Sequence, residues 1–360
     1  MAYTDIDKPS DYFETKLYTG NGGTLNVTGL DFAPNWVWIK SRTSTRVHCL
    51  FDTVRGATKR LQTNEADTEY TTSNSLTGFN SDGFSLGSYN QSNEGSASFA
   101  SWNWKAGTSF TNDASSTGIG SIDSAGSVNT DAGFDIVSYT GNATGGRTIA
   151  HSLSAVPKMM IVKNRDADIK WAVYHASNTA APGTDHLKLN ANDATADDDS
   201  TWNDTVPTSS VFSVGGSTST NGDGTAYIAY LFADVKGYSN FGIYTGNGSA
   251  SDGPVAHLGF RPAFLIIKNN SHADDWRLFD DKRSTTGPSN PIDKHIYAHT
   301  SGAEAASSTN GVPDGVDFLS NGFKIRQATN GLNRDGGTYI YMAWAASPFV
   351  NSNGIPTTAF

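Results

Sequence analysis

Short apolar runs alternate with polar, glycine-rich stretches along the whole chain. Segments such as Phe84–Leu86 and Phe323–Ile325 follow tight turns and place apolar side chains at every second position, which predicts strands with one covered face. Other segments, such as Trp36–Ile39, are apolar at every position, as in a strand covered on both faces. No segment keeps a helical period for more than one or two turns. The pattern therefore predicts an all-β fold.

One set of motifs occurs three times in the same order. The tetrapeptide Tyr-Thr-Gly-Asn begins at Tyr18, Tyr139 and Tyr244. A proline follows 16 or 18 residues later, and a lysine stands six residues after each proline. These pairs are Pro34 and Lys40, Pro157 and Lys163, and Pro262 and Lys268. Because order and spacing hold throughout, the sequence predicts three copies of one unit.

Each copy carries further apolar segments in matching positions. A buried-strand pattern lies between the proline and the lysine, a second apolar run follows, and an aromatic strand closes the unit. The closing segments are 99–104, 227–232 and 339–344. The copies span about 13–106, 133–233 and 238–346, a length of roughly 100 residues that suits one β-sandwich. Solenoid and propeller units are shorter, with periods of about 20–50 residues.

These boundaries predict a chain of three domains and one linker. Residues 1–106 hold the first repeat with an N-terminal arm, 133–236 the second, and 237–360 the third with a C-terminal tail. Residues 107–132 are rich in Gly, Ser, Thr, Asn and Asp, which predicts a flexible or loosely packed linker. The second and third repeats are joined by about four residues, Asp234–Gly237, so we expect their relative orientation to be fixed.

Composition narrows the class of protein. Aromatic residues make up 11% of the chain and charged residues only 17%, which excludes a disordered protein. The net charge is −10, which argues against nucleic-acid binding, since such proteins neutralise phosphates with clustered lysines and arginines. A single cysteine, Cys49, permits no internal disulfide. The polar N-terminus and the lack of 18 consecutive apolar residues predict neither a signal peptide nor a membrane span.

Three lysines stand at equivalent positions: Lys40, Lys163 and Lys268. Each follows a buried strand, so we expect it at the edge or rim of a sheet. Their recurrence suggests an anion site. A structural role, by snorkelling or by an ion pair with Asp52 or Asp280, is the preferred interpretation.

Arginines accompany these positions in only part of the chain. Arg42 and Arg165 follow two of the lysines, whereas the third repeat has Asn270 in that place. Asp–Arg pairs three residues apart occur in the first and third repeats, and we expect them to brace turns rather than to catalyse. These pairs are Asp52 with Arg55 and Asp280 with Arg283.

No spacing of histidines or cysteines predicts a metal site. His295 and His299 are four residues apart, but their surroundings favour an extended segment. The loops 197–199 and 221–224 are acidic or turn-rich; calcium binding is an alternative there, and a solvated loop is the default. Paired carboxylates remain open, because they need only spatial closeness, yet no glutamate recurs in all three copies. We expect no catalytic residue, no metal and no cofactor.

One aromatic residue stands apart from the strand patterns. Trp202 lies in the polar stretch 200–204 and is the single candidate for a ligand-facing ring. The other tryptophans in strand patterns are expected in the core.

The motifs of the first copy resemble a repeat domain of unknown function from virion and tail-fibre-like proteins of marine tailed bacteriophages, of the cyanophage and pelagiphage type. The residues that carry this resemblance are Phe13, Tyr18–Gly22, Gly29–Arg42, Phe51–Gly56 and Phe79–Gly87. The opening segment 2–13 and the closing segment 354–358 are also similar to family members, so the resemblance covers the whole chain. The second repeat departs most, since it lacks the Asp–Arg pair. The family provides no catalytic residues to transfer.

The combined expectation is an all-β chain of three tandem lectin-like (jelly-roll) β-sandwich domains of about 100 residues each. The resemblance implies a non-enzymatic virion structural protein, made in the bacterial cytoplasm. We expect a tail-associated or fibre-like adhesin that contacts host-surface glycans. A capsid decoration (knob) protein and a glycan depolymerase are the alternatives. The expected partners are other virion proteins, a host glycan and further copies of the chain, with no nucleic acid and no membrane insertion.

Overall fold

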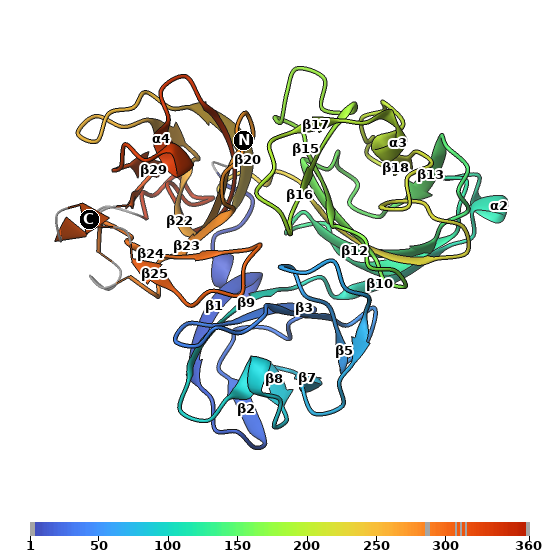
Figure 1. The fold of residues 1–360 in the computed structure, drawn as a ribbon, viewed down its shortest axis with the longest axis horizontal. Coiled ribbons are helices and arrows are strands. Elements are labelled where there is room, and N and C mark those ends of the chain that lie inside the picture. The colour runs from blue at the N-terminus through green and yellow to red at the C-terminus, as the bar shows by residue number, and fades with distance from the viewer. Residues whose placement is uncertain (1–3, 285–288, 307, 310–311, 314, 358–360) are drawn as a thin grey trace.

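The computed structural model describes residues 4–284, 289–306, 308–309, 312–313 and 315–357. Antiparallel sheets account for nearly all of its regular structure, so the all-β prediction is confirmed. The helices of the described part are single turns of three or four residues. Three lobes, one for each repeat, surround a common centre (Figure 1).

Repeat 1 consists of a four-stranded sheet in the order β1-β9-β3-β4, a three-stranded sheet in the order β2-β8-β7 and the short pair β5-β6. The strands are β1 Phe13–Thr19, β2 Leu25–Thr28, β3 Trp36–Ser41, β4 Cys49–Asp52, β5 Lys59–Arg60, β6 Tyr70–Thr71, β7 Leu76–Asn80, β8 Gly83–Leu86 and β9 Ser98–Trp104. The 3-10 turn η1 (Pro9–Asp11) precedes them, and α1 (Asn90–Asn93) precedes β9.

Repeat 2 is built around an eight-stranded sheet in the order β10-β11-β12-β19-β14-β15-β16-β17, with β13 and β18 paired in a second sheet. The strands are β10 Thr108–Asn112, β11 Ser124–Asn129, β12 Phe134–Thr140, β13 Arg147–Ala150, β14 Met159–Asn164, β15 Ala172–His175, β16 Asp185–Lys188, β17 Ala196–Asp197, β18 Val211–Val214 and β19 Ala226–Phe232. The helical turns are α2 Ala114–Thr117 and α3 Asp199–Trp202.

Repeat 3 has a six-stranded sheet in the order β20-β30-β22-β23-β24-β25, a three-stranded sheet in the order β21-β29-β28 and the pair β26-β27. The strands are β20 Ser239–Thr245, β21 Val255–His257, β22 Phe260–Asn269, β23 Arg277–Asp280, β24 Lys294–Tyr297, β25 Ala305–Ala306, β26 Ser308–Thr309, β27 Val312–Pro313, β28 Val316–Leu319, β29 Gly322–Ile325 and β30 Thr338–Pro348. The helical turn α4 (Asn330–Asn333) precedes β30.

The same pairing order recurs in every large sheet. The strand that ends in the Tyr-Thr-Gly-Asn turn (β1, β12 or β20) pairs with the closing strand (β9, β19 or β30). The closing strand also pairs with the strand that carries the buried apolar run (β3, β14 or β22). Equivalent aromatic positions follow from the register, because Trp104 lies opposite Trp36, Phe232 opposite Met159, and Trp344 opposite Phe264. The threefold repetition of motifs is therefore a threefold repetition of topology.

Residues 107–132 do not form the flexible linker that their composition predicts. They form β10, α2 and β11, which extend the edge of the sheet of repeat 2 by pairing onto β12. Small residues make this pairing close: a Cβ atom at Gly126 would lie 2.0 Å from the backbone oxygen of Ile136. The prediction was wrong because glycine and serine here permit tight strand pairing instead of disorder.

Strands that are apolar at every position face two different cores. In β3, Trp36 and Trp38 point into the core shared by the three repeats, whereas Val37 and Ile39 pack against the small sheet of repeat 1. β14 divides its side chains in the same way between the shared core and the core of repeat 2. Because alternate side chains of a strand point to opposite faces, each large sheet lies between its own small sheet and the other two repeats.

Aromatic rings from all three repeats meet at the centre. The equivalent residues Trp104, Phe232 and Trp344 contact one another, with ring centroids 5.4 to 6.4 Å apart. Trp36 and Phe264 lie within 6 Å of this group. Trp104, Phe232 and Trp344 are each almost fully buried. The body is therefore held together by a core that no single repeat can complete.

The N-terminal arm ties the body at the connection between repeats 2 and 3. The backbone N–H of Asp5 and the hydroxyl of Thr4 both donate to Lys236 O. Asp7 accepts from Ser352 in the C-terminal tail. The arm is thus held both by the connection between repeats 2 and 3 and by the C-terminal tail.

We expect Trp104→Ala to lower the free energy of unfolding by about 3–5 kcal/mol, since it leaves a cavity among rings of three repeats. All three repeats should still unfold in one transition, measured by chemical denaturation followed by circular dichroism and by calorimetry. Val206→Ala, at a side chain that is 51% exposed, is the control. A shift confined to one of several separate transitions would contradict a shared core.

Candidate functional site

The Tyr-Thr-Gly-Asn motif lies at the end of β1, β12 and β20, where each strand enters a turn. In repeat 1 the ring of Tyr18 stacks on Phe99 at a centroid distance of 5.1 Å, and its hydroxyl donates to Ser92 O at 2.7 Å. Tyr139 and Tyr244 repeat both contacts, stacking on Tyr227 and Tyr339 and donating to Thr220 O and Leu332 O. The tyrosine thus anchors the turn to the closing strand and to the segment before it.

An asparagine from that segment holds the turn itself. Asn93 accepts from Asn21 N at 2.9 Å and donates to Gly23 O at 2.7 Å. Asn221 and Asn333 make the corresponding contacts in the other repeats. The motif's glycine is required by a close approach, since a Cβ atom at Gly20 would lie 2.2 Å from Glu94 O. The most specific repeated motif therefore builds a rigid turn.

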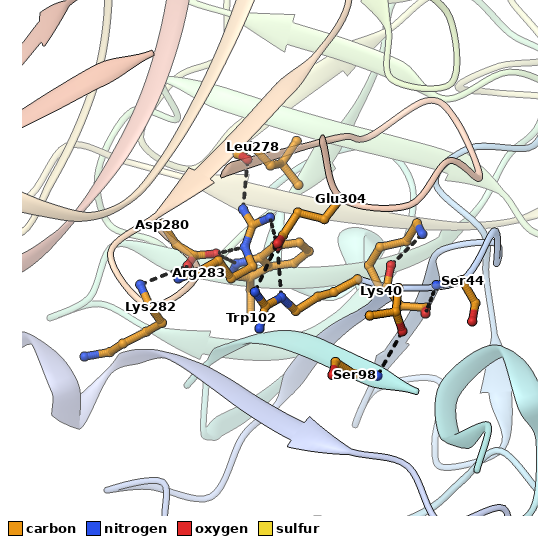
Figure 2. A network of polar contacts seen from close by, with 12 residues as sticks. Lys40, Ser44, Ser98, Trp102, Leu278, Asp280, Lys282, Arg283 and Glu304 are labelled. Atoms are coloured by element: carbon orange, nitrogen blue, oxygen red, sulfur yellow. Dashed lines mark hydrogen bonds and ion pairs between the residues drawn. The ribbon is translucent and has the colours of Figure 1, made fainter. Parts of the chain in front are cut away.

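Charged side chains that the sequence places far apart meet between repeats 3 and 1, at the contact we call junction 3–1 (Figure 2). Arg283 Nε lies 2.5 Å from Asp280 Oδ2, and both side chains are fully buried. Glu304 accepts from Arg283 at 3.2 Å and from Arg42 of repeat 1 at 2.9 Å. Trp102 of repeat 1 donates to Asp280 Oδ2 at 2.9 Å. Each charged side chain in this row of four residues lies beside one of opposite charge.

Junction 1–2 repeats this arrangement between the next two repeats. Asp52 pairs with Arg55 at 2.5 Å, and Glu69 bridges Arg55 at 3.1 Å and Arg165 of repeat 2 at 2.9 Å. Tyr230 of repeat 2 donates to Asp52 Oδ2 at 2.7 Å, in the place that Trp102 takes at junction 3–1. Two junctions therefore use the same Asp, Arg, Glu and Arg positions.

Junction 2–3 holds uncharged residues at the same four positions, namely His175, Asn178, Thr195 and Asn270. Thr195 N donates to Asn270 O, as Glu69 N does to Arg165 O and Glu304 N to Arg42 O. His175 Nε2 contacts Tyr341 O at 3.2 Å. Burial lowers the pKa of His175 to about 4, so the ring is neutral at pH 7. All four charged residues are replaced together, so none of the four is left buried without its partner.

A further set of contacts follows the same cyclic order. One aromatic side chain at the start of the second apolar run of each repeat reaches a backbone oxygen of its neighbour. These contacts are Trp171 Nε1 to Gln62 O at 3.0 Å, Trp276 Nε1 to Lys188 O at 2.9 Å, and His48 Nε2 to Tyr297 O at 3.0 Å. The three repeats are thus related by an approximate threefold arrangement of specific contacts.

The three equivalent lysines are buried at these junctions, and not exposed at a sheet rim. Lys163 Nζ donates to Asn164 O and to Ala66 O of repeat 1, and Lys268 Nζ donates to Asn269 O and to Asn192 O of repeat 2. The expected pairing with Asp52 or Asp280 is wrong, because arginines occupy those carboxylates. Burial lowers the pKa of all three lysines, including Lys40, to about 8.

Trp202 was the one ligand-facing aromatic expected from the sequence, and the structure places it in the core. Its side chain is 0% exposed and lies edge-on to Tyr174. The polar residues around it have a local role, since Asp198 caps α3 by accepting from Ser200 N. A polar neighbourhood in sequence therefore marks a helix cap here, and not an exposed ring.

The remaining metal candidates have other partners. His295 Nε2 contacts Tyr297 Oη at 3.0 Å and His299 Nε2 contacts Asp275 at 3.1 Å. In the described ranges, no group of three or more His, Cys, Asp or Glu side chains is placed to hold a metal ion.

Sequence reasoning missed the two bridging glutamates. Glu69 and Glu304 follow their aspartates, Asp52 and Asp280, by different intervals, so spacing did not align them. Their shared role is visible only in the backbone pairing that each makes with the next repeat. A prediction would have required aligning the β5–β6 and β24–β25 segments, which are too short for a periodic signal.

These features define a class: a single-chain all-β protein whose three repeats enclose one aromatic core and are joined by buried polar junctions. The chain belongs to the family described as Domain of unknown function (DUF7483), whose model matches residues 8–348. Because that match spans every repeat, the family's unit includes all three. Searches of curated proteins and of solved structures returned no match. Among the described residues, no helix is long and apolar enough to cross a membrane.

We expect Asp280→Asn to lower the free energy of unfolding by about 3–5 kcal/mol, because Arg283 then keeps a buried charge without its closest partner. Asp31→Asn is the matched control, since Asp31 pairs with Lys8 at an exposed site and exposed pairs contribute little. Denaturant titrations of both variants measure the difference. Equal losses would show that the buried junction is no stronger than a surface pair.

The lowered pKa of the three lysines predicts that the free energy of unfolding depends on pH. With a folded pKa of about 8 and an ordinary value of 10.5, Lys163 loses its proton in the folded chain before it does in the unfolded chain. Between these values the unfolded state binds more protons, so this group raises the free energy of unfolding as pH increases. The wild type should therefore gain stability relative to Lys163→Met from pH 8 to pH 10, measured by denaturant titration. Parallel curves for the two proteins would contradict the lowered pKa.

Proposed function

We propose that this chain is a non-enzymatic virion structural protein of a bacteriophage, a tail-associated adhesin that contacts glycans of the host surface. The observation that carries the proposal is the use of the recurring polar residues. The repeated Lys, Asp, Arg and Glu positions hold the three repeats together, and the repeated Tyr-Thr-Gly-Asn motif stiffens outer turns. Polar residues that fix the relative positions of the repeats and the shape of their turns are expected in a rigid protein that presents surface loops.

The three repeats are proposed to be lectin-like jelly-roll sandwiches. Support comes from the two facing sheets of each repeat and from the polar loops between their strands. Such loops offer amide and hydroxyl groups, which exchange hydrogen bonds with sugar hydroxyls. Three lobes on one rigid body raise the apparent affinity of individually weak contacts.

The resemblance to repeat domains of marine phage virion proteins supports the location on a particle. It rests on the motifs around Tyr18, Lys40 and Phe84, and the family model places no activity on them.

A capsid decoration protein is the second candidate. One observation favours it: the three repeats form a single three-lobed body (Figure 1). A body with an approximate threefold arrangement suits a threefold position of a protein shell.

Locating the protein on purified particles tests these proposals. An adhesin should be present at a small multiple of three or six copies, should label the tail in electron micrographs of antibody-treated particles, and should block infection when added as free protein. A decoration protein should be abundant and remain on heads separated from tails. Absence from purified particles would overturn both candidates, and release of sugars from host envelopes by the purified chain would replace them with an enzyme.

A further inference from the structure

Junction 2–3 contains a hollow of about 730 Å³ that faces solvent between repeats 2 and 3. This volume falls within the range of about 300–1,000 Å³ seen for small-molecule sites. Residues of β16, β17, β20 and β30 line it together with the loops after β15 and β22. The lining includes three of the four junction positions, Asn178, Thr195 and Asn270.

The side chains that line the hollow differ from those at the other two junctions. At junctions 1–2 and 3–1 the corresponding positions hold two arginines and a glutamate that meet across the interface. Asn178, Thr195 and Asn270 have shorter side chains, and no arginine crosses the interface in their place. The hollow at junction 2–3 is therefore lined by short uncharged side chains at the positions where the other two junctions have arginines and a glutamate.

One polar group in the wall lacks a protein partner. Asn178 is only 2% exposed, and its Nδ2 atom makes no hydrogen bond within the described residues. Its Oδ1 atom accepts from Thr195 Oγ1 at 2.8 Å and from Asn270 Nδ2 at 3.2 Å, which fixes the orientation of the amide. A buried N–H without an acceptor costs free energy, so an oxygen that came within hydrogen-bond distance of this amide from the hollow would be favoured.

The remaining wall specifies the chemistry of that ligand. Asp185, Asp197, Ser177, Ser271 and Thr338 provide carboxylate and hydroxyl oxygens. These accept hydrogen bonds from hydroxyl groups. Among the described residues that line the hollow there is neither lysine nor arginine, so an anionic ligand would meet only like charge.

An apolar side chain completes the wall. Ile243 of β20 lines the hollow and is 44% exposed. It offers a surface for the C–H groups of a ring whose hydroxyls bond to the opposite wall. Ligand sites combine apolar surface with a few placed polar groups in this way.

We propose that the hollow at junction 2–3 binds a neutral, polyhydroxylated ligand, a saccharide without carboxylate or phosphate groups. This inference rests on the proposed adhesin function for its biological meaning, but its chemistry depends only on the junction. It also assigns glycan binding to one position in the body instead of three equivalent ones.

Saturation-transfer NMR on the purified full chain tests the proposal. The probes are oligosaccharides of glucose, galactose, mannose and N-acetylglucosamine, with glucuronate and N-acetylneuraminate as acidic counterparts. We expect at least one neutral probe to bind and the acidic ones to fail. Binding of only the acidic probes, or binding of none of the probes, would overturn the proposal.

Two exposed positions of repeat 3 provide a matched pair of variants. Ile243→Arg places a long charged side chain in the hollow, whereas Val255→Arg makes the same change on β21 at a side chain that is 43% exposed and does not line it. Ile243→Arg should weaken binding of the neutral probe by about tenfold or more through steric exclusion, and Val255→Arg should leave it unchanged. Equal affinities for both variants would place the ligand elsewhere.

A second variant fills the hollow with the side chains of the other junctions: His175→Asp, Asn178→Arg, Thr195→Glu and Asn270→Arg together. Because the same four residues pack at junctions 1–2 and 3–1, we expect this chain to fold and to lose binding. Retained binding in a folded quadruple variant would contradict the proposal. If the variant does not fold, the Ile243→Arg and Val255→Arg pair still decides.

Cell-binding assays separate this inference from the proposed function. Wild-type protein that binds host cells, with Ile243→Arg binding equally well, would overturn the site and leave the adhesin proposal standing. Protein that binds a neutral saccharide in the hollow but never attaches to host cells would support the site and count against the adhesin.

Discussion

The aromatic core shared by the three repeats is the constraint on which the rest of the structure depends. Each large sheet is apolar on both faces, and its own small sheet covers only one. A single repeat would therefore leave rings such as Trp36, Trp104 or Phe264 in water, at a cost of roughly 25 cal/mol for each Å² of apolar surface. Three sheets that cover one another remove that cost. Trp104, Phe232 and Trp344, one from each repeat, contact one another at the centre of this shared core.

The polar junctions are shaped by the same closure. Once the sheets pack together, the ends of their central strands are shielded from water. Each charge buried there then needs an oppositely charged or hydrogen-bonding partner. Junctions 1–2 and 3–1 meet this need with an aspartate, two arginines and a glutamate. Junction 2–3 meets it by having uncharged residues at all four of these positions, His175, Asn178, Thr195 and Asn270. An approximately symmetric body thereby acquires one junction that is chemically distinct from the other two.

Much of the fold was predictable from local pattern. The repeats, the all-β class and the doubly covered strands all follow from spacing and from apolar periodicity, which act over a few residues. The segment 107–132 was misjudged because its strands consist of small and polar residues, and only their pairing onto β12 reveals them. Trp202 was misjudged because its polar neighbours cap a helical turn. Glu69 and Glu304 were missed because their equivalence lies in contacts with another repeat.

The sequence by itself determined that one unit occurs three times and that each unit is a set of strands with two apolar faces. Those properties depend on residue type and spacing, which the chain carries locally. Only the tertiary structure decided that the units form one body, that Lys40, Lys163 and Lys268 are buried, and that Asn178, Thr195 and Asn270 line a hollow at junction 2–3. These outcomes depend on which side chains of different repeats share the same space. Contacts between residues 96 to 262 positions apart set that arrangement, and no local pattern records them.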